Sequence, residues 1–239
     1  MTGNLDKDDV YLHLDTRFRD SGSIQNSRYF VNKIANVKAI SVIDLQFFNI
    51  QYTIDSRNQK LYFNDGSART ATLTKGRYDG TTLATEVASA MNVVSSGYSC
   101  TFSDTTLKMT ISNASAFTLT LSNTTSAIWN VLGFDTGTNS SSATSHTSDN
   151  LVKLSSKYYY ITSNIVNSTH INDDLRDNIL IIFGNTQNYG SLITRPTPQI
   201  IPASNDTIDY IKITLYDDED NIVDCNGINF SFTLRFHRG

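Results

Sequence analysis

Residues 228–236 read INFSFTLRF, and this stretch decides the fold class because its side chains alternate strictly between apolar and polar. The apolar positions are Ile228, Phe230, Phe232, Leu234 and Phe236. A two-residue period is typical of a β-strand with one buried face. Five large apolar side chains left in water would cost roughly 1.5–3 kcal/mol each. We therefore predict that this segment is built into a sheet and is not a loose tail.

A second informative stretch covers residues 39–54. Ile43, Leu45 and Phe47 share one parity, and the other parity is shared by Phe48, Ile50, Tyr52 and Ile54. A flat strand cannot exchange its buried face, so we predict a bulge or a corner between two sheets at Phe47–Phe48. Strands that bend across a corner are typical of sandwiches and barrels.

The composition indicates a globular protein with one core, or one core and a smaller satellite domain. The chain has 239 residues, of which 39% are hydrophobic and 18% are charged. A net charge of -4 offers no broad basic surface, so dedicated nucleic-acid binding is not expected. Neither an N-terminal apolar signal nor about eighteen consecutive apolar residues occur, so we expect an intracellular product without a transmembrane segment.

The residues from 61 to 135 have a different pattern and are expected to form an inserted α+β subdomain. One helix is predicted by apolar residues at helical spacing, namely Leu83, Val87, Ala90, Met91 and Val94. Short alternating runs on both sides of this helix predict strands and a hairpin. Residues 136–150 are polar and low in complexity, which predicts a linker or surface loop.

The remaining strands, with long connections between them, predict a mainly β fold of the Greek-key sandwich or jelly-roll type. The expected divisions are an extended N-terminal arm over 1–28, a discontinuous sandwich over 29–60 and 151–239, the inserted subdomain over 61–135, and the polar loop over 136–150.

Local motifs for catalysis or cofactor binding are absent from the sequence. It contains no phosphate loop, no dinucleotide-binding glycine motif and no nucleophile elbow. The histidines are isolated from one another along the chain, at His13, His146, His170 and His237. We expect neither an enzyme nor a bound cofactor.

The densest acidic cluster could offer calcium the hard oxygen atoms that it prefers. The candidate metal ligands are Asp217, Asp218 and Asp220. Their spacing does not match an EF-hand loop, and we favour the alternative of a solvated turn between two strands.

Two further groups of residues have competing interpretations. Tyr158 and Tyr160 share one face of a predicted strand and could stack on a sugar or a base, although packing in the core or between subunits is favoured. The arginines at Arg17, Arg19 and Arg28 could contact genome phosphates. Pairing with carboxylates of adjacent subunits is preferred because the same segment is rich in aspartate.

Both ends of the chain resemble one protein family. LDTRFRDSGSIQNSRYFV (residues 14–31), VKAISVIDLQFFNIQYTI (37–54) and IDYIKITLYDDEDNIVDCNGINFSFTLRF (208–236) resemble segments of penton proteins. These are the single jelly-roll minor capsid proteins of virophages, polinton-like viruses and related large DNA viruses. The segment between them is similar to a helix-plus-hairpin unit found in both viral capsid and phage tail proteins.

The resemblance implies a single jelly-roll β-sandwich with an inserted α+β subdomain, acting as a pentamer that plugs the fivefold vertices of an icosahedral capsid. The implied partners are further copies of the chain, a double jelly-roll major capsid protein and other minor capsid proteins. The implied location is the virion vertex, after synthesis in the host cytoplasm or a viral factory. Within the segments that resemble penton proteins, we call the following the signature residues: Asp15, Arg17, Arg19, Phe30, Phe230, Phe232, Leu234 and Arg235.

Other functions remain open at this point. A carbohydrate- or receptor-binding β-sandwich, such as a fibre head, is compatible with the tyrosines and with the many Ser, Thr and Asn residues. The middle segment alone is also compatible with a phage tail or baseplate component.

Overall fold

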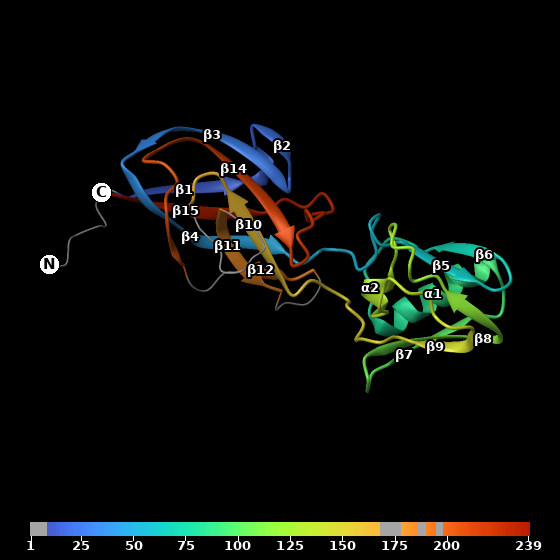
Figure 1. Ribbon diagram of the computed structural model, residues 1–239. Helices are drawn as coiled ribbons and strands as arrows, with labels where there is room; N and C mark the ends of the chain where they lie inside the picture. Colours follow the sequence, from blue (N-terminus) through green and yellow to red (C-terminus); the bar gives the residue numbers. More distant parts are fainter. Residues whose placement is uncertain (1–8, 168–177, 186–189, 195–197) are drawn as a thin grey trace. The chain divides into compact units, whose positions relative to one another are not determined.

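The chain consists of two compact units, each with its own hydrophobic core (Figure 1). The residues that this computed structural model describes are 9–167, 178–185, 190–194 and 198–239. Unit 1 comprises Met1–Gln51 and Ser156–Gly239, and unit 2 comprises Tyr52–Ser155. In the described part of the chain, no helix has the length and apolar character needed to cross a membrane.

Unit 1 is built from two antiparallel sheets that enclose one core. The first sheet contains β1 (Val10–Asp15), β15 (Ser231–Arg238), β4 (Val37–Phe48), β12 (Leu192–Thr194) and β13 (Ile200–Pro202). The second sheet contains β11 (Ile179–Gly184), β10 (Tyr158–Ser163), β14 (Thr207–Asp217), β3 (Asn26–Ala35) and β2 (Ser21–Ser23).

The order of strand pairing makes unit 1 a single jelly roll. The first strand, β1, pairs with the last, β15, and β3 pairs with β14. Inside these pairs, β4 pairs with β12 and β13, and β10 pairs with β11. Such nested pairing describes one antiparallel ribbon folded over into two sheets. Unit 2 is inserted between β4 and β10, and the predicted fold class is therefore confirmed.

The segment that predicted the fold lies at the centre of the first sheet, with β15 between β1 and β4. The inward side chains of β15 are fully buried, and they are Phe232, Leu234 and Phe236. The alternation does not extend to Ile228, which is 46% exposed and precedes the strand. Its amide donates to the Cys225 carbonyl at 2.8 Å, so the backbone is turning there.

The exchange of buried faces predicted at Phe47–Phe48 occurs earlier in β4. Consecutive residues of β15 pair with Val42 and Asp44, which leaves Ile43 as an extra residue. Val42 and Leu45 are both buried, on either side of this bulge. The bulge depends on the register with β15, and residue parity in β4 alone misplaced it.

The extended arm expected over 1–28 differs from the structure. Residues 1–8 lie outside the described residues, but β1 pairs with β15 along its whole length. The chain then passes through a 3-10 turn, η1 (Thr16–Phe18), into β2. Leu14 is buried in the core, and the short alternation leading to it is obscured by the surrounding charged residues.

Unit 2 contains two helices and five strands. The elements are β5 (Lys60–Asn64), β6 (Ala68–Thr72), α1 (Gly80–Val94), β7 (Ser99–Ser103), β8 (Lys108–Leu119), α2 (Trp129–Leu132) and β9 (Ala143–Thr147). Helix α1 is the helix predicted from apolar spacing, and a capping box of Asp79 and Thr82 begins it. The unit extends beyond the expected range of 61–135 on both sides.

The polar loop expected over 136–150 contains strand β9, which pairs with β8. Its Ser145 and Thr147 hydroxyls lie 2.9 Å from the hydroxyls of facing residues on β8. His146 is buried, and its Nε2 donates to the Phe117 carbonyl at 2.9 Å. Backbone and hydroxyl hydrogen bonds hold β9 in place. Its sequence has no alternating apolar pattern, so the strand was not predicted.

Replacing Phe232 by alanine should destabilise unit 1 by about 3–5 kcal/mol, because a fully buried ring is lost from the central strand. The matched control, Ile228→Ala, should change stability by about 0.5 kcal/mol or less. Native-state hydrogen exchange of peptides from β4 and β14 reports unit 1 separately from unit 2. Equal protection in the two variants would contradict the central position of β15.

Candidate assembly site

The N-terminal signature forms a corner between the two sheets of unit 1, and we call residues 15–20 the corner. Asp15 ends β1 and is 8% exposed. Its carboxylate accepts hydrogen bonds from the Arg17 backbone amide at 2.8 Å and from Arg17 Nε at 2.9 Å. The hydrogen bond from the Arg17 side chain lowers the pKa of Asp15 below its usual value, so the carboxylate is held in its charged form.

Further polar contacts close the corner. Arg19 Nη1 donates to the Thr16 carbonyl at 2.6 Å, and Arg19 Nε donates to the Gly22 carbonyl at 3.0 Å. The Asp20 carboxylate accepts from the Phe30 amide at 2.6 Å. Arg17 and Arg19 therefore make contacts that shape their own chain, whereas the sequence suggested contacts with neighbouring subunits or a genome.

Thr16 connects the N-terminal signature with the C-terminal one. It is fully buried, and its amide donates to the Phe230 carbonyl at 3.0 Å. Its hydroxyl donates to Asn229 Oδ1 at 3.0 Å and accepts from the Phe230 amide at 3.0 Å. Sequence reasoning did not single out Thr16, because its partners lie more than two hundred residues away.

The apolar signature residues of β15 and its start belong to the core. Phe230, Phe232 and Leu234 are each at most 3% exposed. Phe230 packs edge-on against Phe47, with ring centroids 6.0 Å apart. Their signature role is therefore to fill the sandwich, and they present no surface to a partner.

Arg235 lies on the outer face of the first sheet. Its Nε donates to the Asp9 carboxylate at 2.6 Å, and its guanidinium lies 5.7 Å from the centre of the Tyr11 ring. The Asp9 side chain is fully buried by these contacts. Arg235 thus fixes the start of β1 onto β15.

Three residues near this contact are ordered as in a hydrolytic triad. His237 Nδ1 lies 3.4 Å from the Asp9 carboxylate, and His237 Nε2 lies 3.0 Å from Ser41 Oγ. Ser41 is 2% exposed within β4, so a substrate has no access to its hydroxyl. The array ties β1, β15 and β4 together. His170 lies outside the described residues.

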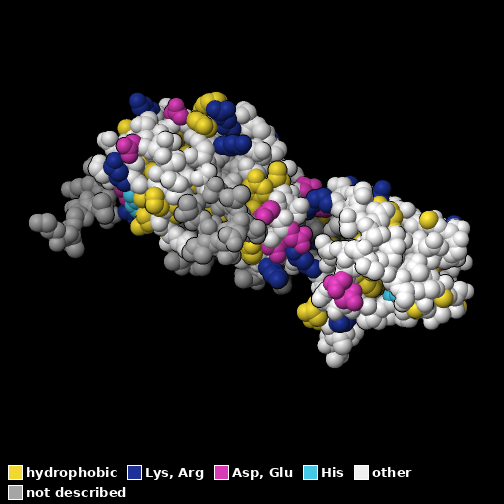
Figure 2. All heavy atoms as spheres, viewed as in Figure 1, with side chains coloured by type: hydrophobic (Ala, Val, Ile, Leu, Met, Phe, Trp, Pro, Cys, Tyr) yellow, Lys and Arg dark blue, Asp and Glu magenta, His cyan; other side chains and the backbone are white. Residues whose placement is uncertain are grey.

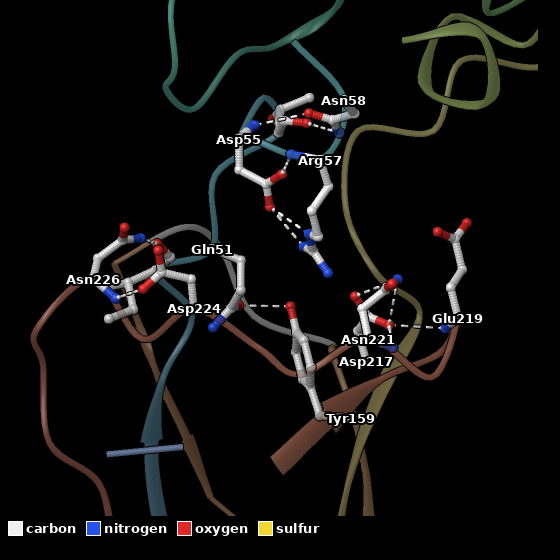
Figure 3. A network of polar contacts seen from close by, with 12 residues as sticks. Gln51, Asp55, Arg57, Asn58, Tyr159, Asp217, Glu219, Asn221, Asp224 and Asn226 are labelled. Carbon is white, nitrogen blue, oxygen red and sulfur yellow. Dashed lines mark hydrogen bonds and ion pairs between the residues drawn. The ribbon is translucent and has the colours of Figure 1, made fainter. Parts of the chain in front are cut away.

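The acidic turn, residues 217–221, is held by Asp217. Asp217 Oδ1 accepts from the amides of Glu219 at 3.0 Å and Asn221 at 2.9 Å. Figure 3 shows the Asp217 and Asn221 side chains turned toward one another within this turn. The carboxylate therefore serves its own turn, as in other aspartate-initiated turns.

The other two candidate metal ligands point to different donors. Asp218 accepts from the Lys157 amide at 3.1 Å, and Asp220 accepts from the Tyr160 hydroxyl at 2.6 Å. Within the described ranges, no three His, Cys, Asp or Glu residues are grouped so that they could hold a metal ion. The three carboxylates thus accept hydrogen bonds from different donors in and around the turn.

The tyrosines of β10 are mainly core residues. Tyr159 is fully buried and packs on Phe47, with ring centroids 5.3 Å apart. Tyr160 is 3% exposed and stacks on Tyr216 at 5.1 Å. The platform predicted from the sequence paired Tyr160 with Tyr158, and only Tyr158 is partly exposed, which weakens the carbohydrate-binding alternative.

One signature residue is exposed in a cluster that could contact a partner. Phe30 is 64% exposed, and the Arg28 guanidinium lies 4.9 Å from its ring centre and 4.5 Å from that of Tyr210. Figure 2 shows hydrophobic and basic side chains next to one another over β2 and β3. Arginine stacked on exposed aromatic rings is typical of interaction surfaces.

A solved structure of mavirus penton protein is similar to this chain. The two are 10% identical with a TM-score of 0.48, and the alignment covers 97% of this chain and 99% of that chain. No protein-family model matches the chain, and no curated protein is similar to it in sequence. At this identity the similarity concerns the fold alone.

Replacing Thr16 by valine should destabilise unit 1 by about 1–3 kcal/mol, because the Phe230 amide and the Asn229 side chain lose a buried partner. The shape of the side chain is kept, so packing should not change. The control is Thr207→Val, at an exposed position of β14. Urea unfolding of both variants measures the difference, and equal midpoints would argue against the role of Thr16.

The Asp15 contact should make stability depend on pH in a defined direction. Because the folded-state pKa of Asp15 is depressed, its stabilisation is present above the usual value of 3.8 and is lost as the pH falls through the lower folded value. Relative to Asp15→Asn, the native chain should be more stable by about 1 kcal/mol at pH 7. Unfolding of both proteins at pH 7 and pH 3 tests this, and a difference that grows at pH 3 would refute it.

Proposed function

We propose that this chain is a structural virion protein, and specifically a penton protein whose pentamers plug the fivefold vertices of an icosahedral capsid. The observation that carries the proposal is the contact of both signature segments at Thr16, Asn229 and Phe230. Segments that resemble the penton family at the two ends of the chain thus form one structural feature. The single jelly roll agrees with this, since that architecture occurs in viral capsid proteins.

Five copies around an axis would use head-to-tail contacts that close into a ring. Such contacts also cover strand edges, which otherwise favour uncontrolled pairing with other chains. The exposed cluster of Arg28, Phe30 and Tyr210 is a candidate for one side of the contact. The proposed further partners are a double jelly-roll major capsid protein and other minor capsid proteins, at the vertex of the virion.

The alternatives are less well supported. Jelly rolls also occur in lectin domains, so the fold by itself does not exclude a receptor-binding fibre head. The burial of Tyr160 leaves only Tyr158 of the predicted pair partly exposed, so the pair does not present two rings to a sugar. A tail or baseplate component would leave the contact between the two signature segments unexplained. A catalytic role is not proposed, because the hydroxyl of Ser41 is enclosed.

The mass of the purified protein in solution tests the proposal. One chain weighs 26.6 kDa, so a ring of five should weigh five times 26.6 kDa, about 133 kDa. Native mass spectrometry at low micromolar concentration should show this species as a discrete peak. Because assembly on a capsid can require the major capsid protein, the same measurement is made with that protein present.

A discrete trimer would contradict the penton proposal and point to a fibre or tail component. A monomer that neither forms rings nor joins capsid shells of the major capsid protein would also overturn it. Binding to defined glycans by such a monomer would then favour the receptor-binding alternative.

A further inference from the structure

A polar hollow of about 280 Å³ lies on the outer face of the second sheet of unit 1. Three strands line it, with Ser21, Gly22 and Ser23 on β2, Asn26 and Arg28 on β3, and Lys212 on β14. Among the described residues that line this hollow, none is acidic and none is large and apolar. The hollow therefore presents positive charge and hydrogen-bonding groups.

One row of side chains across this face is charged. Strand register pairs Ser21 directly with Arg28, and Arg28 with Lys212. Directly paired residues point to the same face of a sheet. The alternate residues Ser27 and Ile213 are buried, so the row faces outward. Two cations thus lie side by side, an arrangement that destabilises a sheet unless negative charge is near.

The described residues do not supply this negative charge. None of their carboxylates forms an ion pair with Arg28 or Lys212. The Asp20 carboxylate, at the start of β2, accepts instead from the Phe30 amide at 2.6 Å. The two cations can therefore receive an anion from outside the chain.

Arg28 is already held in one orientation. Its guanidinium lies 4.9 Å from the centre of the Phe30 ring and 4.5 Å from that of Tyr210. Stacking uses the flat face of the guanidinium and leaves the N–H groups at its edge to donate. Such a fork can donate two hydrogen bonds to one oxyanion, and fixing it beforehand lowers the entropic cost of binding.

A second row beside the charged one carries only neutral polar side chains. It crosses four strands and consists of Ser23, Asn26, Thr214 and Thr162. With strands about 4.8 Å apart, the row extends about 14 Å. At its far end, a second hollow of about 250 Å³ is lined by Asn164, Asn178 and Thr162, and it shares Lys212 with the first. Hydroxyl and amide side chains both donate and accept, as sugar hydroxyls require.

The distribution of charge distinguishes between two kinds of anionic ligand. A nucleic-acid strand carries one phosphate about every 3.4 Å, so several phosphates would lie along the neutral row without a cation. A sulfated saccharide carries sparser anions, separated by neutral hydroxyls. One sulfate can accept from Arg28 and Lys212 while the hydroxyls pair with the neutral row. Two cations beside a neutral polar row therefore fit the saccharide better.

We propose that the outer face of β2, β3 and β14 binds a sulfated saccharide, with one sulfate held by Arg28 and Lys212. The sugar hydroxyls would pair with Ser23 and Asn26. This site is separate from the tyrosine pair of β10 considered from the sequence. The inference goes beyond the proposed function and does not depend on the formation of a ring.

Calorimetric titration of the full-length protein with a heparin-derived tetrasaccharide at low salt tests the proposal. The tetrasaccharide should bind saturably, and its desulfated form should bind at least about tenfold more weakly. Arg28→Gln and Lys212→Gln should each weaken binding about tenfold, as expected when a charged hydrogen bond is lost. The matched control, Lys75→Gln, removes one positive charge from an exposed position of unit 2 and should leave binding unchanged.

Arg28 and Lys212 are both exposed, so their variants should fold, and unfolding midpoints check this. Equal binding by the control and by both site variants would overturn the proposal, since the saccharide would then bind elsewhere. Absence of saturable binding would overturn it as well. A single-stranded oligonucleotide of the same charge serves as a second probe. If it binds as tightly as the tetrasaccharide, charge alone decides and the saccharide is rejected as the ligand.

The native mass of the same samples separates this outcome from that of the proposed function. A ring of five 26.6-kDa chains that does not bind the tetrasaccharide would leave the penton proposal standing and reject the site. A ring that binds it would support both proposals. Binding by a monomer that joins neither rings nor capsid shells would support the site and contradict the penton proposal.

Discussion

The contact between Thr16 and the start of β15 is the constraint on which the rest of unit 1 depends. In a jelly roll the first strand must pair with the last, so the fold closes only when the two ends of the chain meet. Thr16 fixes which residues of the two ends pair, because buried polar groups require hydrogen-bond partners. Its amide and hydroxyl have theirs in Asn229 and Phe230. The register of β1 on β15 follows from this contact, and so does the start of the second sheet.

Much of the fold could be predicted from local patterns, but register could not. The alternation of β15 and the apolar spacing of α1 are properties of short segments, and both elements lie where those patterns place them. The bulge at Ile43 depends on how β4 aligns with β15 and was therefore misplaced. Strands β1 and β9 were missed because charged or hydroxyl side chains replace part of the apolar pattern.

The sequence indicated which residues belong to the candidate site. It did not indicate which contacts most of these residues make. Resemblance drew attention to Asp15, Arg17 and Arg19, yet these close a corner within their own chain. The signature residue Phe30 is exposed, and its partners Arg28 and Tyr210 are brought together by the pairing of β3 with β14. Contacts between distant segments leave no local signal in a single sequence.

The corner, residues 15–20, also determines which edges of β1 and β3 have no pairing strand among the described residues. By directing the chain from β1 into β2 and β3, it uses the charged residues of the segment for internal contacts. It leaves one edge of β1 and part of β3 beside a groove whose charged lining residues are basic, in a chain whose net charge is -4. Closure of the fold thus uses the charged side chains of the corner, while in the described part of the chain the strand edges beside the groove have no pairing strand.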